Sequence, residues 1–216
     1  MKKYTKDEAL KILTECAKQY EKELNQKSLL FLCKDKNQRL FAFEVTFFSR
    51  NFMHLTGVKP AHTQSNLKNS KFFYNKCLSS RLSKNDFEFS KDGTTHLKLN
   101  ALPSVISKNL NAKMLGSYNG QRLHLHTEKI AGNHYACLGF VKSEADYIPN
   151  TLIQDNIKNL TGNKFYQIVA TFRKPYTEQT YREITYKSNN FDFKTYELPQ
   201  EYAYLKKYFF ADFTEK

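Results

Sequence analysis

The chain has 216 residues, a formal net charge of +13, 18 Phe and 14 Tyr. This length allows one domain with an extension or two small domains, and it is sufficient to bury a sizeable core. A transmembrane helix needs about 18 consecutive apolar residues, and no such run is present, so a membrane protein is disfavoured.

The first quarter of the chain predicts one helix followed by a hairpin. Residues 5–26 begin with Thr5 and Glu8, a capping box that is typical of a helix start. Apolar residues then recur at helical spacing, which predicts one buried face. They are Leu10, Leu13, Ala17, Tyr20 and Leu24. Residues 28–48 contain two apolar runs around a polar turn at 35–38, which predicts a β-hairpin.

Residues 47–60, FFSRNFMHLTGVKP, are interpreted as an aromatic strand that meets a Thr-Gly turn, with His54 at its end. Residues 69–83 predict a second helix. The Asp92-Gly93 pair predicts a turn before an alternating strand at 95–99. Residues 102–112 predict a short helix that begins at Pro103.

The second half of the chain predicts a sheet. Two tight turns, Asn119-Gly120 and Gly132-Asn133, separate the first three strands, as in a meander. The five predicted strands are 112–120, 121–130, 134–142, 164–173 and 181–188. Residues 147–162 predict a turn and a short helix ended by Gly162. The aromatic C-terminal segment is predicted to be helical and packed. The fold class is therefore α+β, with N-terminal helices packed on an antiparallel β-meander.

The cysteines and the first residues indicate the compartment. The four cysteines are scattered and form no CxxC pair, which argues against a disulfide framework or a zinc cage. The opening MKKYTKDEAL has no apolar stretch after its basic pair, so we expect no secretory signal. We expect a reduced, cytoplasmic protein.

The positive charge is concentrated in one segment. Residues 51–110 hold nine Lys and Arg against three Asp and Glu, together with His54, His62 and His96. This distribution favours a polyanionic partner, chiefly nucleic acid. The alternative is a compositional bias, because Asn, Lys, Phe and Tyr are all abundant, as an AT-rich genome would encourage.

The motifs that are absent exclude several classes of enzyme. No phosphate-binding glycine loop and no GxSxG motif is present, and carboxylates are scarce in the basic half. His124 and His126 form an HxH pair that would suit a metal, although Arg122 beside them disfavours a cation. The remaining groups suffice for metal-independent RNA cleavage: histidine as acid or base, and Lys and Arg to stabilise phosphate charge. The 2′-OH is the nucleophile, so no cofactor is expected.

A series of motifs resembles the phage-associated barnase–EndoU–colicin–RelE-like nuclease domains. In order they are NFMHLTGV (51–58), FFYNKCLSSRLS (72–83), DGTTHLKLNALP (92–103), KMLGSYNG (113–120), TEKIAGNHYACLGF (127–140) and YIPNT (147–151). The resemblance implies helices followed by a β-meander, metal-independent ribonuclease activity and toxin-like or mobile-element biology. It implies a division into an extension (1–39), a nuclease domain (40–190) and a packed aromatic tail (191–216).

The candidate site combines this resemblance with residue chemistry. The expected catalytic residues are His54, Lys129, Arg81, Tyr118 and Thr127. His54 is the expected acid or base, Lys129 and Arg81 stabilise the charge on the phosphate, and Tyr118 and Thr127 position the substrate. The expected substrate-binding residues are Thr56, His126 and Lys98. Strand alternation puts Thr127 and Lys129 on one face and His124 and His126 on the other; family resemblance favours the first pair and polarity the second.

The sequence therefore predicts a metal-independent endoribonuclease of phage or mobile-element origin. RNA is its expected partner, with an inhibitor or a host nucleoprotein as a further one. An alternative is a non-enzymatic protein on the same scaffold that binds nucleic acid or blocks a host nucleoprotein. That alternative predicts salt-sensitive binding without turnover. A weaker alternative is a structural protein that uses its aromatic tail.

Overall fold

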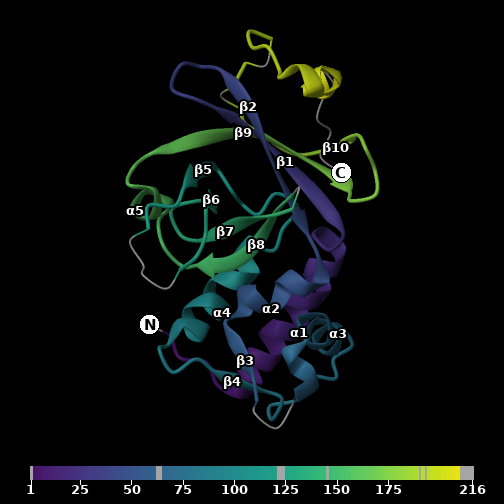
Figure 1. Cartoon of the computed structure of the whole chain (residues 1–216), viewed down its shortest axis with the longest axis vertical. Helices are drawn as coiled ribbons and strands as arrows, with labels where there is room; N and C mark the ends of the chain where they lie inside the picture. Colours follow the sequence, from purple (N-terminus) through teal and green to yellow (C-terminus); the bar gives the residue numbers. More distant parts are fainter. Residues whose placement is uncertain are drawn as a thin grey trace.

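The computed structural model of the chain describes residues 2–61, 65–120, 125–144, 146–189, 191–192 and 194–209. Figure 1 shows α1–α4 gathered at one end of the molecule and a curved sheet at the other, with α5 beside the sheet and the C-terminal segment above it. Among the described helices, none is both long enough and apolar enough to cross a membrane.

Helix α1 (Lys6–Glu23) forms where the capping box predicts it. The Thr5 hydroxyl accepts the Glu8 N–H at 3.2 Å, and the Glu8 carboxylate accepts the Thr5 N–H at 2.8 Å. These two bonds satisfy donors that a helix start otherwise leaves open. The predicted apolar stripe is buried at Leu13 and Tyr20, which lie in the core.

Strands β1 (Lys27–Lys34) and β2 (Leu40–Phe47) form the predicted hairpin, with Lys34 opposite Leu40. The Asp35 carboxylate closes the turn by accepting the Arg39 N–H at 2.8 Å. Strand β1 also pairs with β9, so both of its edges are bonded and its six inner residues are buried. The predicted extension 1–39 thus contributes a strand to the same sheet as the rest of the chain.

The segment around His54 is helical, which corrects the prediction of a strand. A 3-10 turn, η1 (Ser49–Asn51), leads into α2 (Phe52–Thr56), and Gly57 ends this helix in the left-handed region at φ 71°. Phe52 and Leu55, three residues apart, are both buried. A short apolar run fits a helix as well as a strand. Here the i, i+3 spacing of the two buried residues fits the helix.

Four further elements complete the helical end. After η2 (Ser65–Lys68), α3 (Ser70–Leu78) confirms the second predicted helix, and the Asn69 side chain caps it. Strands β3 (Val58–Pro60) and β4 (Phe87–Phe89) pair separately from the main sheet.

Helix α4 (Thr94–Val105) replaces the strand predicted at 95–99. Leu99, Leu102 and Val105 are buried at intervals of three, which fits a helix face. Pro103 lies near the end of this helix rather than at its beginning. His96 and Lys98, expected on one strand face, are two residues apart on a helix and so point in different directions.

Within the described residues the main sheet has eight strands in the order β1-β2-β8-β7-β6-β5-β9-β10, and the β1–β9 pairing closes seven of them into a ring. All pairings are antiparallel except a short parallel contact between β2 and β8. The remaining strands are β5 (Met114–Ser117), β6 (Lys129–Gly132), β7 (Cys137–Ser143), β8 (Asp146–Ile153), β9 (Phe165–Pro175) and β10 (Glu183–Lys187). The protein is a mixed α+β fold with a large, mostly antiparallel sheet, as its predicted class requires.

Strand β8 was not predicted. Residues 147–162 were interpreted as a turn and a helix, but Asp146–Ile153 is a strand, and only α5 (Ile157–Thr161), ended by Gly162, matches that prediction. Pro149 argues against a strand because it has no N–H to donate. It is accommodated opposite Phe140, where the β7–β8 register shifts.

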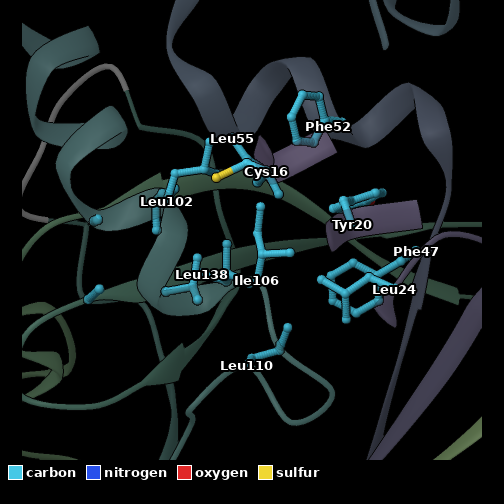
Figure 2. Packing of buried hydrophobic residues seen from close by; sticks show 14 of the residues in the cluster. Cys16, Tyr20, Leu24, Phe47, Phe52, Leu55, Leu102, Ile106, Leu110 and Leu138 are labelled. Carbon is cyan, nitrogen blue, oxygen red and sulfur yellow. The ribbon is translucent and has the colours of Figure 1, made fainter. Parts of the chain in front are cut away.

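The main core lies between the helices and the inner face of the sheet ring. Figure 2 shows Tyr20, Phe52 and Leu102 converging there from three helices. A second cluster joins Leu205 and Phe209 of η3 (Gln200–Phe209) to the outer sheet face. A third cluster lies beneath α5.

Candidate active site

His54 is held outward by the short helix α2. Its neighbours Phe52 and Leu55 are buried, whereas the imidazole is exposed. Thr56 is also fully buried: its hydroxyl donates to Met53 O at 2.7 Å and accepts the Val58 N–H at 3.3 Å. The Thr56 side chain is therefore inside the fold, where it fixes the end of the helix that carries His54, and its contact with substrate stays a prediction.

Helix α4 fastens the end of α2. The Thr95 hydroxyl donates to Gly57 O at 2.6 Å. A side chain at Gly57 would come within 2.8 Å of Lys98 Cδ, so the absence of a Cβ lets the lysine stem cross this turn. The close approach and the left-handed φ of 71° both require glycine here.

The Lys98 ammonium joins the helices to the sheet. Its Nζ donates to His54 O at 2.8 Å and to Thr151 Oγ1 on β8 at 3.1 Å. An ammonium has three donors, so its contacts with the described residues leave one for a ligand. Burial lowers the pKa of Lys98 to about 8, while the negative charge of Asp92 acts in the opposite direction. Within the described ranges no carboxylate forms an ion pair with it.

Two effects hold the pKa of His54 below its usual value. Partial burial against its neighbours is the larger effect, and the positive charge of Lys98 is the second. Both disfavour the imidazolium form. His54 is therefore a neutral proton acceptor at neutral pH, with a cation beside it.

The loop before β6 reaches the same part of β8. The Asn150 side chain donates to His126 O, and its oxygen lies 3.1 Å from the Thr127 hydroxyl. Thr127 is 9% exposed, whereas His126 is exposed. Asn150 and Thr151 are neighbours on β8. Hydrogen bonds from Asn150 hold this loop, and a hydrogen bond to Thr151 holds Lys98, which also bonds the backbone of His54.

Gly139 leaves room for the side chains of both Thr127 and Thr151. A Cβ at this position would lie 2.6 Å from Thr127 Oγ1 and 2.7 Å from Thr151 Cγ2. Four of the expected residues are thus tied to one crossing of α2, α4 and β8. They are His54, Lys98, Thr127 and His126.

Lys129 is not part of that crossing. It lies opposite Phe140, and Ile130 lies opposite Gly139, so the Lys129 side chain shares the sheet face of Phe140 and not the face of Gly139. Its ammonium donates to Ser117 Oγ at 3.0 Å. Thr127 lies against Gly139, so the expectation that Thr127 and Lys129 share a face is wrong, because β6 begins only at Lys129 and alternation does not extend back to Thr127.

Arg81 and Tyr118 also lie apart from His54 in their described contacts. Arg81 is exposed in the turn after α3, where its N–H donates to Lys76 O at 2.9 Å. Tyr118 follows β5, packs against the cluster beneath α5, and donates its N–H to Glu128 O at 3.0 Å. His124, the first histidine of the HxH pair, lies outside the described residues.

Sequence reasoning missed Asn150 and Thr151. Both lie in the YIPNT motif, but the segment was interpreted as a turn, so neither side chain was placed on a sheet. The β-branched and apolar residues at 151–153 were the available signal. In the part of the chain that the structure describes, no group of three or more His, Cys, Asp or Glu is positioned to hold a metal ion.

Comparison with known proteins gives one match. The family model described as phage-Barnase-EndoU-ColicinE5/D-RelE like nuclease4 matches residues 12–190. Neither the curated proteins nor the solved structures gave a match. The matched range contains α2, α4 and β8, and hence every residue of the crossing described above. The chain belongs to the phage-Barnase-EndoU-ColicinE5/D-RelE like nuclease4 family.

Proposed function

We propose that this protein is a metal-independent endoribonuclease in which His54 takes the proton of a ribose 2′-OH. The observation that carries the proposal is an exposed histidine of lowered pKa whose main-chain oxygen accepts a hydrogen bond from the Lys98 ammonium, in a member of a nuclease family. A neutral imidazole is the form that a general base requires.

Lys98 supplies the second function. Cleavage moves the 2′-oxygen onto phosphorus, breaks the bond from phosphorus to the 5′-oxygen, and places negative charge on the phosphorane. The free donor of Lys98 meets that charge. With a pKa of about 8, its ammonium is protonated at neutral pH and is acidic enough to give a proton to the leaving 5′-oxygen.

The other residues of the crossing position these two. Thr151 and the backbone of His54 fix the ammonium, and Thr127 and Asn150 hold the loop that presents His126 to the RNA. Lys129, Arg81 and Tyr118 are proposed to act on parts of the RNA away from the scissile bond.

Further parts of the proposal rest on the family alone. They are a barnase-like packing of the helices on the β5–β8 meander, the division into 1–39, 40–190 and 191–216, a phage or mobile-element role in the cytoplasm, and an inhibitor or host nucleoprotein as a second partner. The match over residues 12–190 supports the family-based parts and agrees with the boundary at 190, whereas its start lies inside the proposed extension.

Analysis of the products tests the mechanism. Mass spectrometry of digested RNA should find 2′,3′-cyclic phosphate and 5′-hydroxyl ends, and an oligonucleotide with 2′-deoxyribose at the cleaved position should stay intact. Cleavage of the deoxy substrate would contradict attack by the 2′-OH. Salt-sensitive binding without any product would instead support the non-enzymatic alternative.

A further inference from the structure

The end of the sheet remote from α1–α4 carries an exposed aromatic ring. Tyr166, near the start of β9, is 39% exposed. The ring of Phe41 on β2 meets it in a T-shaped contact with ring centroids 4.8 Å apart, and the backbone of Tyr166 pairs with Leu115. Tyr166 is therefore an exposed ring whose orientation is fixed from two sides.

A hollow of about 300 Å³ lies beside this ring. One wall is the β1–β2 turn and the other is the start of β9, which Figure 1 shows at the sheet end away from α1–α4. The lining residues are Asp35, Lys36, Asn37, Lys164, Phe165 and Tyr166. A hollow bounded by an aromatic ring and amide or ammonium donors is suited to a nucleobase and its phosphate.

The charge around the hollow is positive. Lys36 and Lys164 are exposed, and neither forms an ion pair with another described residue. The one carboxylate in the lining, Asp35, is occupied by Arg39, whose N–H and Nε donate to it at 2.8 and 3.0 Å. Two ammonium groups are thus available to an anion.

Lys129 extends this surface across the sheet. Leu115 and Ser117 lie on one face of β5, and their partners across the neighbouring strands are Tyr166 and Lys129. Tyr166 and Lys129 therefore share that face, roughly 12 Å apart by the usual strand spacing. The Lys129 ammonium bonds only to a neutral hydroxyl, Ser117 Oγ, among the described residues.

We propose that Lys36, Tyr166, Lys164 and Lys129, here called the rim surface, bind single-stranded RNA. A base stacks on Tyr166, and the three ammonium groups hold the phosphates on either side. Stacking tolerates any base, because every base has a π-face, so the rim surface adds affinity without strong sequence preference.

The Tyr166 hollow of the rim surface is separate from His54, whereas Lys129 lies two residues after Thr127 of the crossing. Strand β2 begins beside the rim at Leu40 and ends next to α2 at Phe47, and its eight residues span about 26 Å. Only a strand of several nucleotides can reach both places. The proposal rests on the proposed function for its RNA substrate, but its test is a binding measurement that does not need cleavage.

The test uses fluorescence anisotropy with a labelled 2′-O-methyl oligonucleotide of about 15 residues, which cannot be cleaved by its own 2′-oxygen. Tyr166→Ala should weaken binding roughly tenfold, whereas Tyr166→Phe should retain it because the ring remains. Tyr176→Ala is the matched control: Tyr176 is 47% exposed and contacts Phe48 at 5.0 Å, beyond the other end of β9. The double change Lys36→Gln and Lys164→Gln should reduce the salt dependence of binding.

Unchanged affinity in folded Tyr166→Ala, an equal loss in Tyr176→Ala, or loss in Tyr166→Phe would overturn the rim surface. If the wild type binds through Tyr166 but cleaves nothing, the proposed function fails and the rim surface stands. If RNA is cleaved and Tyr166→Ala binds normally, the rim surface alone fails.

Discussion

At the scale of single residues, His54 and Lys98 carry the proposed cleavage chemistry. Sequence reasoning selected both, but it placed His54 on a strand and gave Lys98 only a substrate-binding role. Their relation depends on α4 passing over Gly57, and this contact joins residues far apart in the chain. No local pattern encodes such a contact, so the pair became visible only in three dimensions.

Removing the cation should change the titration of His54. In Lys98→Met the positive charge beside the imidazole is lost, so the pKa of His54 should rise toward its ordinary value, without reaching it because partial burial remains. NMR titration of the imidazole signals measures this shift, with exposed Lys91→Met as the control. A His54 pKa that stays constant in Lys98→Met would contradict the electrostatic coupling.

Lys98 should also make stability depend on pH. Its folded pKa of about 8 lies below the unfolded value of about 10.4, so the unfolded chain binds more protons between these two pH values. The free energy of unfolding contributed by this group therefore rises as the pH increases from about 8 to about 10.4. Urea unfolding of wild type and Lys98→Met should show a difference that changes with pH over this window, and a constant difference would refute it.

At the scale of elements, patterns that repeat within one segment were predicted well and those that depend on partners were not. The capping box, the hairpin and the Gly162 helix stop are local signals, and the structure confirms all three. Helix α4 was mistaken for a strand because THLKL alternates in polarity, although its apolar spacing also fits a helix. Strand β8 was missed because Pro149 forbids a regular strand unless a register shift accommodates it.

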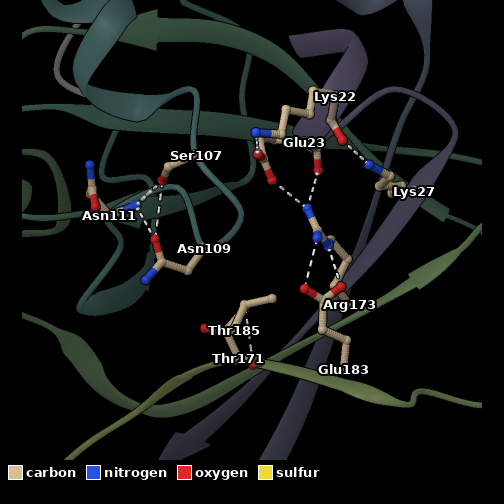
Figure 3. A network of polar contacts seen from close by, with 10 residues as sticks. All are labelled: Lys22, Glu23, Lys27, Ser107, Asn109, Asn111, Thr171, Arg173, Glu183 and Thr185. Atoms are coloured by element: carbon tan, nitrogen blue, oxygen red, sulfur yellow. Dashed lines mark hydrogen bonds and ion pairs between the residues drawn. The ribbon is translucent and has the colours of Figure 1, made fainter. Parts of the chain in front are cut away.

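One side chain ties α1 to the far strands of the sheet. Figure 3 shows Arg173 between Glu23 at the end of α1 and Glu183 on β10. It donates to Glu23 Oε2 at 2.6 Å and to both Glu183 oxygens at 2.7 Å, and its side chain is only 13% exposed. Loss of the guanidinium leaves the carboxylate of Glu23, 12% exposed, with only the longer pair to the exposed Lys22 ammonium at 3.7 Å.

Arg173→Met should therefore lower the free energy of unfolding by about 3 kcal/mol. Arg182→Met is the matched control, since Arg182 is 75% exposed and meets Glu178 at 3.9 Å, a surface pair of small expected effect. Urea unfolding measures both variants. Equal losses in the two variants would show that the Arg173 contacts do not join the elements.

At the scale of the whole molecule, the fold separates His54 and Lys98 from the Tyr166 hollow, and the net positive charge favours binding of a polyanion. Helices α1–α4 close one end of the sheet ring and place His54 and Lys98 at its side, while the Tyr166 hollow of the rim surface lies at the other end. The net charge of +13 indicated a polyanionic partner from the sequence alone. The predicted boundary between residues 39 and 40 falls inside the β1–β2 hairpin, and β1 also pairs with β9. The sequence of one segment carries no sign of a pairing with a strand so distant in the chain.

The most direct test of the account is cleavage of a labelled RNA panel in EDTA by wild type, His54→Ala and His134→Ala. His134 is an exposed histidine bonded to Asn156, outside the crossing of α2, α4 and β8. The account predicts cleavage by wild type and His134→Ala and a loss of about 100-fold or more in His54→Ala. Failure of the wild type to cleave any RNA, or cleavage by His54→Ala at the wild-type rate, would contradict it.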